Sequence, residues 1–412
     1  MSKFVKIMIA LVLTLAVASP ALADMKWNGY YRLQMVSQDI TDASSDDSNQ
    51  MIDNRLRFKF TNTVNDNISV VYYGEVDTPW GESSKGAIGG GGKVGADGVN
   101  IETKNAYVAF KIPSTSFTLT TGIQGIGTGG AFEDLVYSND MAAAKLSGDV
   151  GPAKLTLTYA KWDEGARTAW DDTDMYAVTA TFGINENVKL TGHVTYQDLN
   201  ASGGATDTYA GINADVRFGK MGVEGFFLYR MLDGDDVIAD GDAFVLDGKF
   251  RTILPMGDMK VHAAYFSADD DDTDNNRFAA SSGAWEYHSD NLMIFLQDIY
   301  YNNSGGGSRA LYDAAYAGYG LMFLTVSGKL SLTSAMYAKY GAGYFMAADE
   351  EPDGAAERDD ASLGFEVAAM IGKKFAEKYD VSLRGAYASL GDFYGDDTED
   401  MWKVVGMINV GY

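Results

Sequence analysis

The 412-residue sequence contains no cysteine, only six prolines and only three histidines. Without cysteine the chain can form neither a disulfide framework nor a thiolate zinc site, and the haem-attachment motif C-x-x-C-H is excluded as well. Basic residues are scarce, since 32 Lys and Arg stand against 57 Asp and Glu and give a net charge of −25. A chain this acidic is not expected to bind nucleic acid.

Long apolar runs are missing too, apart from one near the N-terminus. Lys3 and Lys6 precede an apolar run over 7–17, and the small-residue stretch SPALA follows at 19–23. This layout predicts a cleavable secretory signal over residues 1–23, because a membrane anchor needs about 18–20 apolar residues. Removal of the leader with its two lysines takes the net charge to −27. No later stretch is long enough for a transmembrane helix.

Aromatic residues and glycine are abundant, with 25 Tyr, 20 Phe and 47 Gly. Many segments alternate apolar and polar residues, which is the signal of a strand with one apolar face. In LRFKF (56–60), for example, Leu56, Phe58 and Phe60 share one face. Other alternating segments are KLTLTY (154–159), VKLTGHVTY (188–196), VSLRGAY (381–387) and the C-terminal WKVVGMINVGY (402–412).

The connections between these segments alternate between short and long. The tight turns are expected at 63–67, 111–115, 149–153, 184–187, 219–222, 254–258, 327–329 and 376–380. Long polar loops are expected at 38–51, 78–100, 125–139, 164–173, 200–206, 233–241, 268–310, 342–360 and 391–399. Short turns at one end and long loops at the other are typical of an all-β, antiparallel transmembrane barrel, with short periplasmic turns and long extracellular loops. We therefore predict one barrel over 24–412 with 18 strands. Sixteen strands are the alternative, because 268–310 is a long outer loop that could hold a strand pair, a helix or a plug.

The alternation continues to the last residue. In a closed barrel the last strand pairs with the first, because an unpaired edge is costly in lipid. We expect 402–412 to pair with 27–35, and the aromatic side chains of Trp27, Trp402 and Tyr412 to lie at the membrane interfaces.

Together these features resemble the Gram-negative outer-membrane porins. The terminal aromatic after alternating apolar residues resembles the signal that the barrel-assembly machinery reads, and its residues here are Trp402, Val404, Ile408, Val410 and Tyr412. The segments 106–112 and 117–124 resemble the family's hairpin of strands 4 and 5, although Ala109 and Ile123 replace its usual Gly and Arg. The resemblance implies an outer-membrane channel for small hydrophilic solutes and ions, without cofactor or enzymatic activity. It also implies a homotrimer that contacts lipid and lipopolysaccharide.

In that family the loop after strand 5 folds into the lumen and narrows the pore. The matching segment is 125–140, and its acidic residues Glu133, Asp134 and Asp140 are the candidate constriction residues; an ordinary surface loop is the alternative. If 56, 58 and 60 face lipid, then the residues between them face the lumen. This gives a candidate basic wall opposite the loop, made of Arg32, Arg55, Arg57, Lys59 and Lys111. These basic residues either set up an electric field across the pore, together with the acidic loop, or are simply charged side chains that a water-filled lumen tolerates.

The acidic surplus lies mainly in the expected outer loops, such as 269–275 and 349–354. It favours a weak preference for cations. These loops could bridge to lipopolysaccharide phosphates through divalent cations or could be merely solvated. The acidic run at 269–276 lacks the Gly and Glu of an EF-hand loop, so no metal site is predicted. Two other functions stay open: a substrate-specific channel for carboxylates or sugars, and a barrel that surrounds an electron-transfer partner.

Overall fold

A computed structural model describes residues 24–40, 49–82, 91–95, 99–128, 131–164, 172–199, 204–234, 239–270, 274–279, 290–296, 309–352, 356–395 and 398–412. The expected signal segment 1–23 lies outside the described residues, as do parts of the expected long loops.

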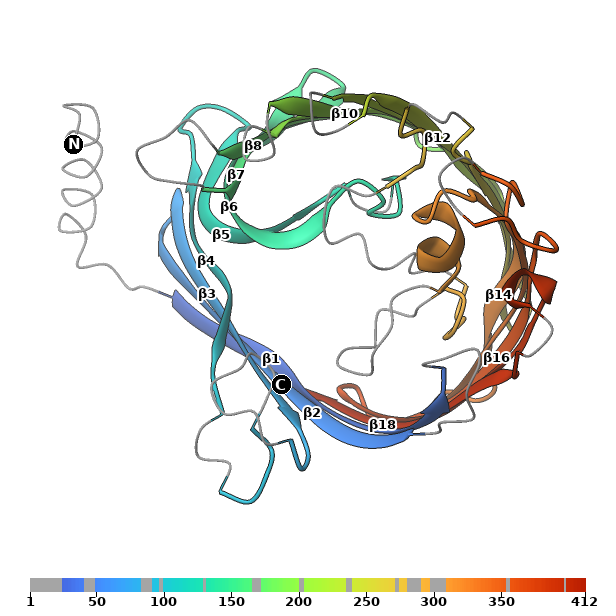
Figure 1. Ribbon diagram of the computed structural model, residues 1–412. Coiled ribbons are helices and arrows are strands. Elements are labelled where there is room, and N and C mark those ends of the chain that lie inside the picture. The colour runs from blue at the N-terminus through green and yellow to red at the C-terminus, as the bar shows by residue number, and fades with distance from the viewer. Residues whose placement is uncertain are drawn as a thin grey trace.

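The described residues form 18 antiparallel strands that close into a ring (Figure 1), which confirms the predicted architecture and strand number. The first nine strands are β1 (Asp24–Asp39), β2 (Asn49–Asn65), β3 (Ile68–Pro79), β4 (Glu102–Lys111), β5 (Thr118–Gly127), β6 (Ser138–Val150), β7 (Ala153–Asp163), β8 (Thr173–Asn185) and β9 (Val188–Leu199). The others are β10 (Ala205–Phe218), β11 (Met221–Asp233), β12 (Gly241–Leu254), β13 (Gly257–Phe266), β14 (Leu321–Ser331), β15 (Met336–Met346), β16 (Ser362–Ala376), β17 (Tyr379–Leu390) and β18 (Met401–Gly411). Two short helices accompany them, η3 (Leu311–Ala315) and η4 (Asp392–Tyr394). Among the described residues no helix has the length and hydropathy that crossing a membrane would require.

Short and long connections alternate around the ring as predicted, but one turn lies elsewhere. The expected turn at 327–329 is part of β14, and the chain reverses between Ser331 and Met336 instead. Gly328 has a packing role there: a Cβ on it would lie 2.2 Å from the carbonyl oxygen of Asp258 and 2.6 Å from the hydroxyl of Tyr340. The glycine therefore marks a close approach between strands and not a turn.

The two faces of each strand differ in the sense expected for a barrel in lipid. On β16, Phe365, Val367 and Ile371 are exposed on the outer face, whereas Glu366 is fully buried on the inner face. A soluble sheet would place these groups the other way round, because its apolar face packs inward. An apolar exterior with a polar interior is what transmembrane barrels present.

The first and last strands close the barrel. β1 pairs with β18 from Tyr30–Gly411 to Asp39–Trp402. Backbone N–H···O bonds of 3.1 and 3.0 Å join Gly29 and Tyr412 in both directions, and the Tyr412 hydroxyl donates to the Arg57 carbonyl at 2.9 Å. Trp27 is 60% exposed and lies 5.8 Å from the Tyr412 ring between centroids, so an aromatic cluster covers this seam on the outside.

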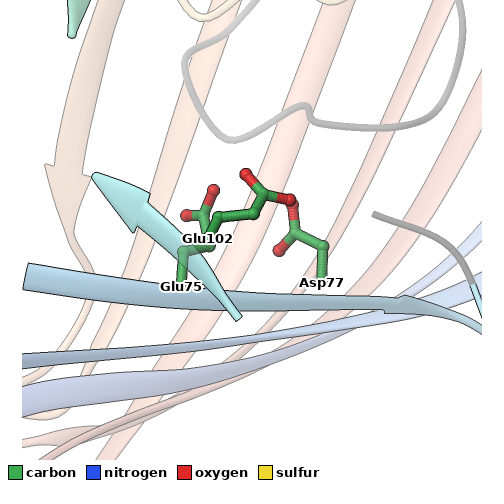
Figure 2. Close-up of side chains that lie close together, drawn as sticks. All are labelled: Glu75, Asp77 and Glu102. Carbon is green, nitrogen blue, oxygen red and sulfur yellow. The ribbon is translucent and has the colours of Figure 1, made fainter. Parts of the chain in front are cut away.

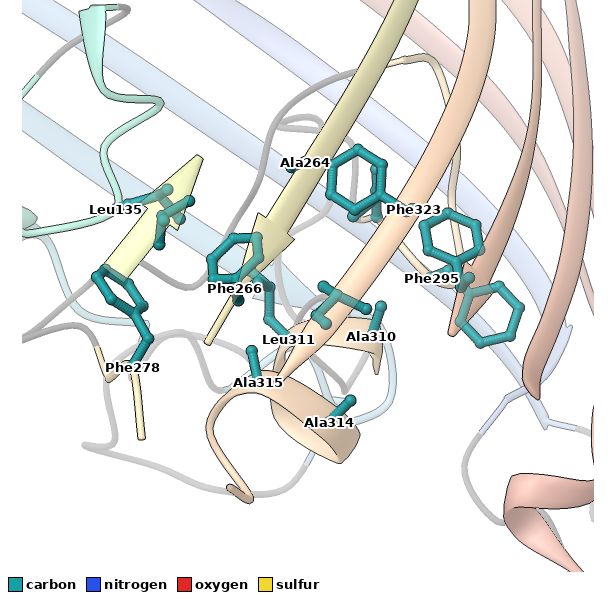
Figure 3. Packing of buried hydrophobic residues seen from close by; sticks show 14 of the residues in the cluster. Leu135, Ala264, Phe266, Phe278, Phe295, Ala310, Leu311, Ala314, Ala315 and Phe323 are labelled. Carbon is teal, nitrogen blue, oxygen red and sulfur yellow. The ribbon is translucent and has the colours of Figure 1, made fainter. Parts of the chain in front are cut away.

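A large apolar cluster lies inside the ring. Figure 1 shows the end of the β5–β6 hairpin and the segment containing η3 within the barrel. Figure 3 shows side chains of these segments against the inner wall, with Phe266 beside Leu311 and Phe295 near Phe323. The described parts of 268–310 form no strand pair, and residues 290–296 lie against the inner faces of β14–β16. In-folded chain therefore occupies one side of the lumen.

Candidate channel constriction

The connection between β5 and β6 makes a tight reversal. The Thr128 N–H donates to the Tyr137 carbonyl at 3.1 Å, and the Leu135 N–H donates to the Phe132 carbonyl at 3.0 Å. Between these bonds Glu133 (φ 50°) and Asp134 (φ 56°) both adopt the left-handed conformation. This conformation is uncommon for residues other than glycine and persists where surrounding contacts fix it.

Aromatic contacts fix the tip of this loop to the inner wall formed by β9–β11. The Phe132 side chain is fully buried, with ring centroids 5.7 Å from His193 on β9 and 5.6 Å from Phe226 on β11. Gly211 on β10 makes room for it, since a Cβ there would lie 2.6 Å from the Phe132 ring. Tyr137 packs against His193 as well, and burial raises the pKa of Tyr137 to about 12, so its hydroxyl stays neutral.

Ion pairs attach the loop at two further points. Glu133 pairs with Lys249 on β12, whose side chain is fully buried. At the base of the loop, Asp140 lies 2.5 Å from the Lys104 ammonium and accepts a 3.0 Å hydrogen bond from Asn105 on β4. Asp134 lies close to β5, where a Cβ on Gly127 would be 2.6 Å from its Oδ1. The three acidic residues singled out from the sequence thus lie at the tip and the base of one loop that crosses the interior.

The candidate basic wall contains carboxylates that the sequence analysis missed. Arg55 binds Asp77 on β3 through two hydrogen bonds, one of them 2.6 Å from Nε to Oδ1, and its Nε lies 3.0 Å from Glu75. Arg57 pairs with Glu75. Arg32 lies beside Arg55 in the register of β1 and β2. The wall is therefore a mixed array of charges, in which the guanidinium groups of Arg55 and Arg57 are paired with carboxylates.

Two lysines of the predicted set lie apart from this array. Lys59 lies over the Tyr73 ring, 5.9 Å from its centroid, and lines a polar recess of about 420 Å³. Residues of β2–β6 share this recess, among them Asn105, Gln124 and Lys145. Lys111 is exposed at the end of β4. The recess shows that polar space remains on this side of the lumen.

Figure 2 shows three carboxylates that lie close together: Glu75, Asp77 and Glu102. Their ligand atoms lie within 4.8 Å of one another. Because Arg55 and Arg57 already neutralise two of the three, we interpret this group as part of an ion-pair network and assign no metal to it.

Comparison with known proteins agrees with this architecture. The sequence profile described as Gram-negative porin matches residues 9–306, well over half of the chain. The chain belongs to the Gram-negative porin family. This confirms the resemblance drawn from the sequence and places the porin in the outer membrane as a channel for small solutes. The family and the fold are those of channels and not of enzymes.

Solved structures of Pseudomonas aeruginosa porins share the fold. The porin is similar to OccK5 (OpdH) with a TM-score of 0.60 and 10% identity over 94% of this chain and 98% of that one. It is similar to OpdK with a TM-score of 0.60 and 11% identity over 94% and 99%, and to OpdL with 0.62 and 10% over 94% and 99%. No curated protein sequence matches the chain significantly.

Proposed function

We propose that this porin is a passive, water-filled channel whose narrowest part lies between the 125–140 loop and the charged wall of β1–β3. The observation that carries the proposal is the attachment of the loop across the lumen, with Glu133 bound to Lys249 and Asp140 bound to Lys104. Solutes then pass Arg55, Arg57, Glu75 and Asp77 on the side that the loop leaves open, driven only by their gradient.

We also propose a weak preference for cations. Glu75 and Asp77 neutralise arginines that would otherwise attract anions, so the acidic surplus of the chain, 57 Asp and Glu against 32 Lys and Arg, is not offset in the pore. A pore with an excess of carboxylates concentrates cations and repels anions.

The reversal potential of single channels in a KCl gradient tests both statements. The wild-type porin should show ohmic steps and a reversal potential of the cation sign. The double variant Glu133→Gln, Asp134→Asn should lower the cation preference. A reversal potential identical to that of the wild type would remove these residues from the constriction.

A substrate-specific channel for small carboxylates is the second candidate, and two observations favour it. Within the described part of the chain neither Lys59 nor Lys145 forms an ion pair, and both line the recess of about 420 Å³. In addition, a structure of Pseudomonas aeruginosa OpdK, which is 10% identical to this chain, was solved with vanillate. Current block by vanillate that disappears in the variant Lys59→Gln, Lys145→Gln would favour this function over unselective diffusion.

The partners follow from the family and from the C-terminal strand. We propose that the barrel-assembly machinery recognises the strand containing Trp402, Val404, Ile408, Val410 and Tyr412, and that the porin forms homotrimers in contact with lipopolysaccharide. Chemical cross-linking in native outer membranes, resolved by denaturing electrophoresis, tests the trimer directly.

A further inference from the structure

The segment 290–296 is bound to the inner wall through a carboxylate of the wall. Glu366 on β16 is fully buried and accepts the backbone N–H groups of three consecutive residues, Met293 at 2.5 Å, Ile294 at 3.1 Å and Phe295 at 2.8 Å. The Phe295 ring stacks on Phe345 of β15, with 4.7 Å between centroids. This end of the segment is held by contacts that need no charge on the segment itself.

The other end of the segment is held by its own carboxylate. Asp290 is buried, and its oxygens lie 2.5 Å from the Lys260 ammonium and 2.7 Å from Nδ1 of His262, both on β13. The Thr325 hydroxyl of β14 donates to it at 2.6 Å. Gly341 on β15 lets the backbone come this close, since a Cβ there would lie 2.3 Å from the Asp290 carbonyl oxygen.

His262 lies between two carboxylates. Its Nδ1 is 2.7 Å from Asp290, and its Nε2 is 2.6 Å from Asp247 on β12. The Phe323 ring, 5.0 Å away between centroids and perpendicular to the imidazole, packs against it. A neutral imidazole has one N–H, whereas the imidazolium has two. With both carboxylates ionised, both contacts are hydrogen bonds only when His262 carries the second proton.

The surrounding charges balance in the same state. Charged groups that face His262 or continue its network come from β12, β13, the 290–296 segment and the 125–140 loop, and they include Asp247, Lys249, Lys260, Asp290 and Glu133. Glu224 of β11 acts on Lys249 as well, and it is itself paired with Arg251. From β14 the residues that face it, Phe323 and Thr325, carry no charge. Among the five groups Asp247, Lys249, Lys260, Asp290 and Glu133, three carboxylates meet two ammonium groups, and the imidazolium balances their charges. A buried charge without a partner is strongly destabilising.

We propose that His262 is a proton-dependent latch that, as an imidazolium, fastens the 290–296 segment to the wall of the lumen and releases it on deprotonation. Loss of the proton sets an imidazole lone pair against a carboxylate and leaves one negative charge of the network uncompensated. The Asp290 end of the segment then leaves the wall, and the free cross-section of the channel changes. The latch needs only that the porin be a channel, so it stands whether or not the 125–140 loop is the constriction.

Proton linkage sets the steepness of the response. If release of the segment is accompanied by release of one proton, the equilibrium between bound and released segment changes about tenfold per pH unit over the transition. The bound form is favoured at acidic pH and the released form at alkaline pH.

Accessibility of a cysteine on the segment tests the latch without reference to conduction. The chain has no cysteine, so Leu292→Cys, at a fully buried position, is a unique reporter, and Ser334→Cys in the exposed β14–β15 turn is its reference. A water-soluble thiosulfonate is applied to the barrel from pH 5 to pH 9. The rate of modification in Leu292→Cys is divided by the rate in Ser334→Cys, and this ratio removes the intrinsic pH dependence of thiol chemistry. This ratio should rise with pH, by about tenfold per unit over the transition.

Two further variants decide the interpretation. Combined with the reporter, His262→Gln should give a ratio that is high already at pH 5 and no longer depends on pH. Gly341→Ala should also raise the ratio at pH 5, because its methyl group pushes Asp290 away without any change in charge. The proposal would be overturned if the ratio did not depend on pH when His262 is present. It would also be overturned if His262→Gln left the pH dependence of the ratio unchanged. Ile294→Cys serves as the reporter should Leu292→Cys fail to fold.

Discussion

Glu133 and Lys249 form an ion pair although 116 residues separate them in the chain. Glu133 lies at a left-handed position in the tip of the 125–140 loop, and Lys249 lies on the inner face of β12. Lys249 is also 3.3 Å from Asp247, so the tip of the loop joins the network that contains His262. A strained loop tip and a fully buried ammonium group thus fix each other in the lumen.

Replacing Lys249 tests this attachment. Lys249→Met keeps the length of the side chain but leaves Glu133 and Asp247 without their cation, and breaking a buried pair in this way costs about 3–5 kcal/mol. The loop should detach and single-channel conductance should increase. Lys189→Met, at an exposed position of β9, is the matched control and should leave conductance unchanged. Equal conductance in the Lys249→Met and Lys189→Met channels would show that the pair does not hold the loop.

Gly211 tests the aromatic side of the same attachment. In Gly211→Val the new side chain collides with the Phe132 ring, and overpacking of this kind costs about 1–3 kcal/mol. We expect a noisier and larger single-channel current together with a lower melting temperature. Gly192→Val on the neighbouring strand β9 is the control, because a Cβ at Gly192 has no atom within 4 Å. If the two variants behave alike, the position of Phe132 has no bearing on conduction.

The ion pair of Arg55 and Asp77 predicts opposite shifts in selectivity. Arg55→Gln leaves Asp77 without its cation and should increase cation preference, whereas Asp77→Asn leaves Arg55 with Glu75 as its only carboxylate partner among these ion pairs and should decrease it. The reversal potential in a KCl gradient measures both. Shifts of the same sign would mean that this wall does not face the conducting path.

Protonation of Asp290 at low pH should weaken the attachment of the 290–296 segment. Burial alone would raise the pKa of Asp290, but hydrogen bonds and charges from His262 and Lys260 hold it below its ordinary value. A group with a depressed pKa stabilises the bound state fully above its ordinary pKa of about 3.9, and this contribution is lost as the pH falls further. Single-channel conductance should therefore change between about pH 4 and pH 2. In Asp290→Asn this acid transition should be absent, and its persistence would assign the transition to another group.

Tyr412 tests the closure of the barrel. Tyr412→Phe removes the hydrogen bond from the hydroxyl to the Arg57 carbonyl and should lower the free energy of unfolding by about 0.5–1.5 kcal/mol. Tyr412→Ala, which also loses the packing on Trp27, should lower it further. Urea unfolding of the refolded barrel in detergent micelles measures both. Equal stability of the wild type and Tyr412→Ala would mean that the terminal ring does not stabilise the seam.

The strands were predictable because their signal is local. Alternation within segments such as 56–60 or 402–412 fixes the lipid face without knowledge of the partner strand. The closing pair of β1 and β18 follows from the same alternation at both ends of the chain.

The composition of the site was less predictable because it depends on register and on distant segments. Glu75 and Asp77 alternate on one face of β3, but only the pairing Arg57–Glu75 and Arg55–Asp77 places them on the arginines. That pairing depends on an irregularity between Thr63 and Asn65. The contact between His262 and Asp290 gives no local signal. The apolar run at 292–296, unusual within a long polar loop, was the one available sign that this segment packs inside.

Polymer exclusion in single-channel recordings tests the central claim most directly. Poly(ethylene glycol)s of increasing size are added to the wild-type porin and to Lys249→Met. For each channel, the cut-off is the polymer size above which the polymer no longer enters the pore and no longer reduces the conductance. We expect a small cut-off for the wild type and a larger one when the loop is released in Lys249→Met. Identical cut-offs in two conducting channels would contradict a constriction formed by the 125–140 loop.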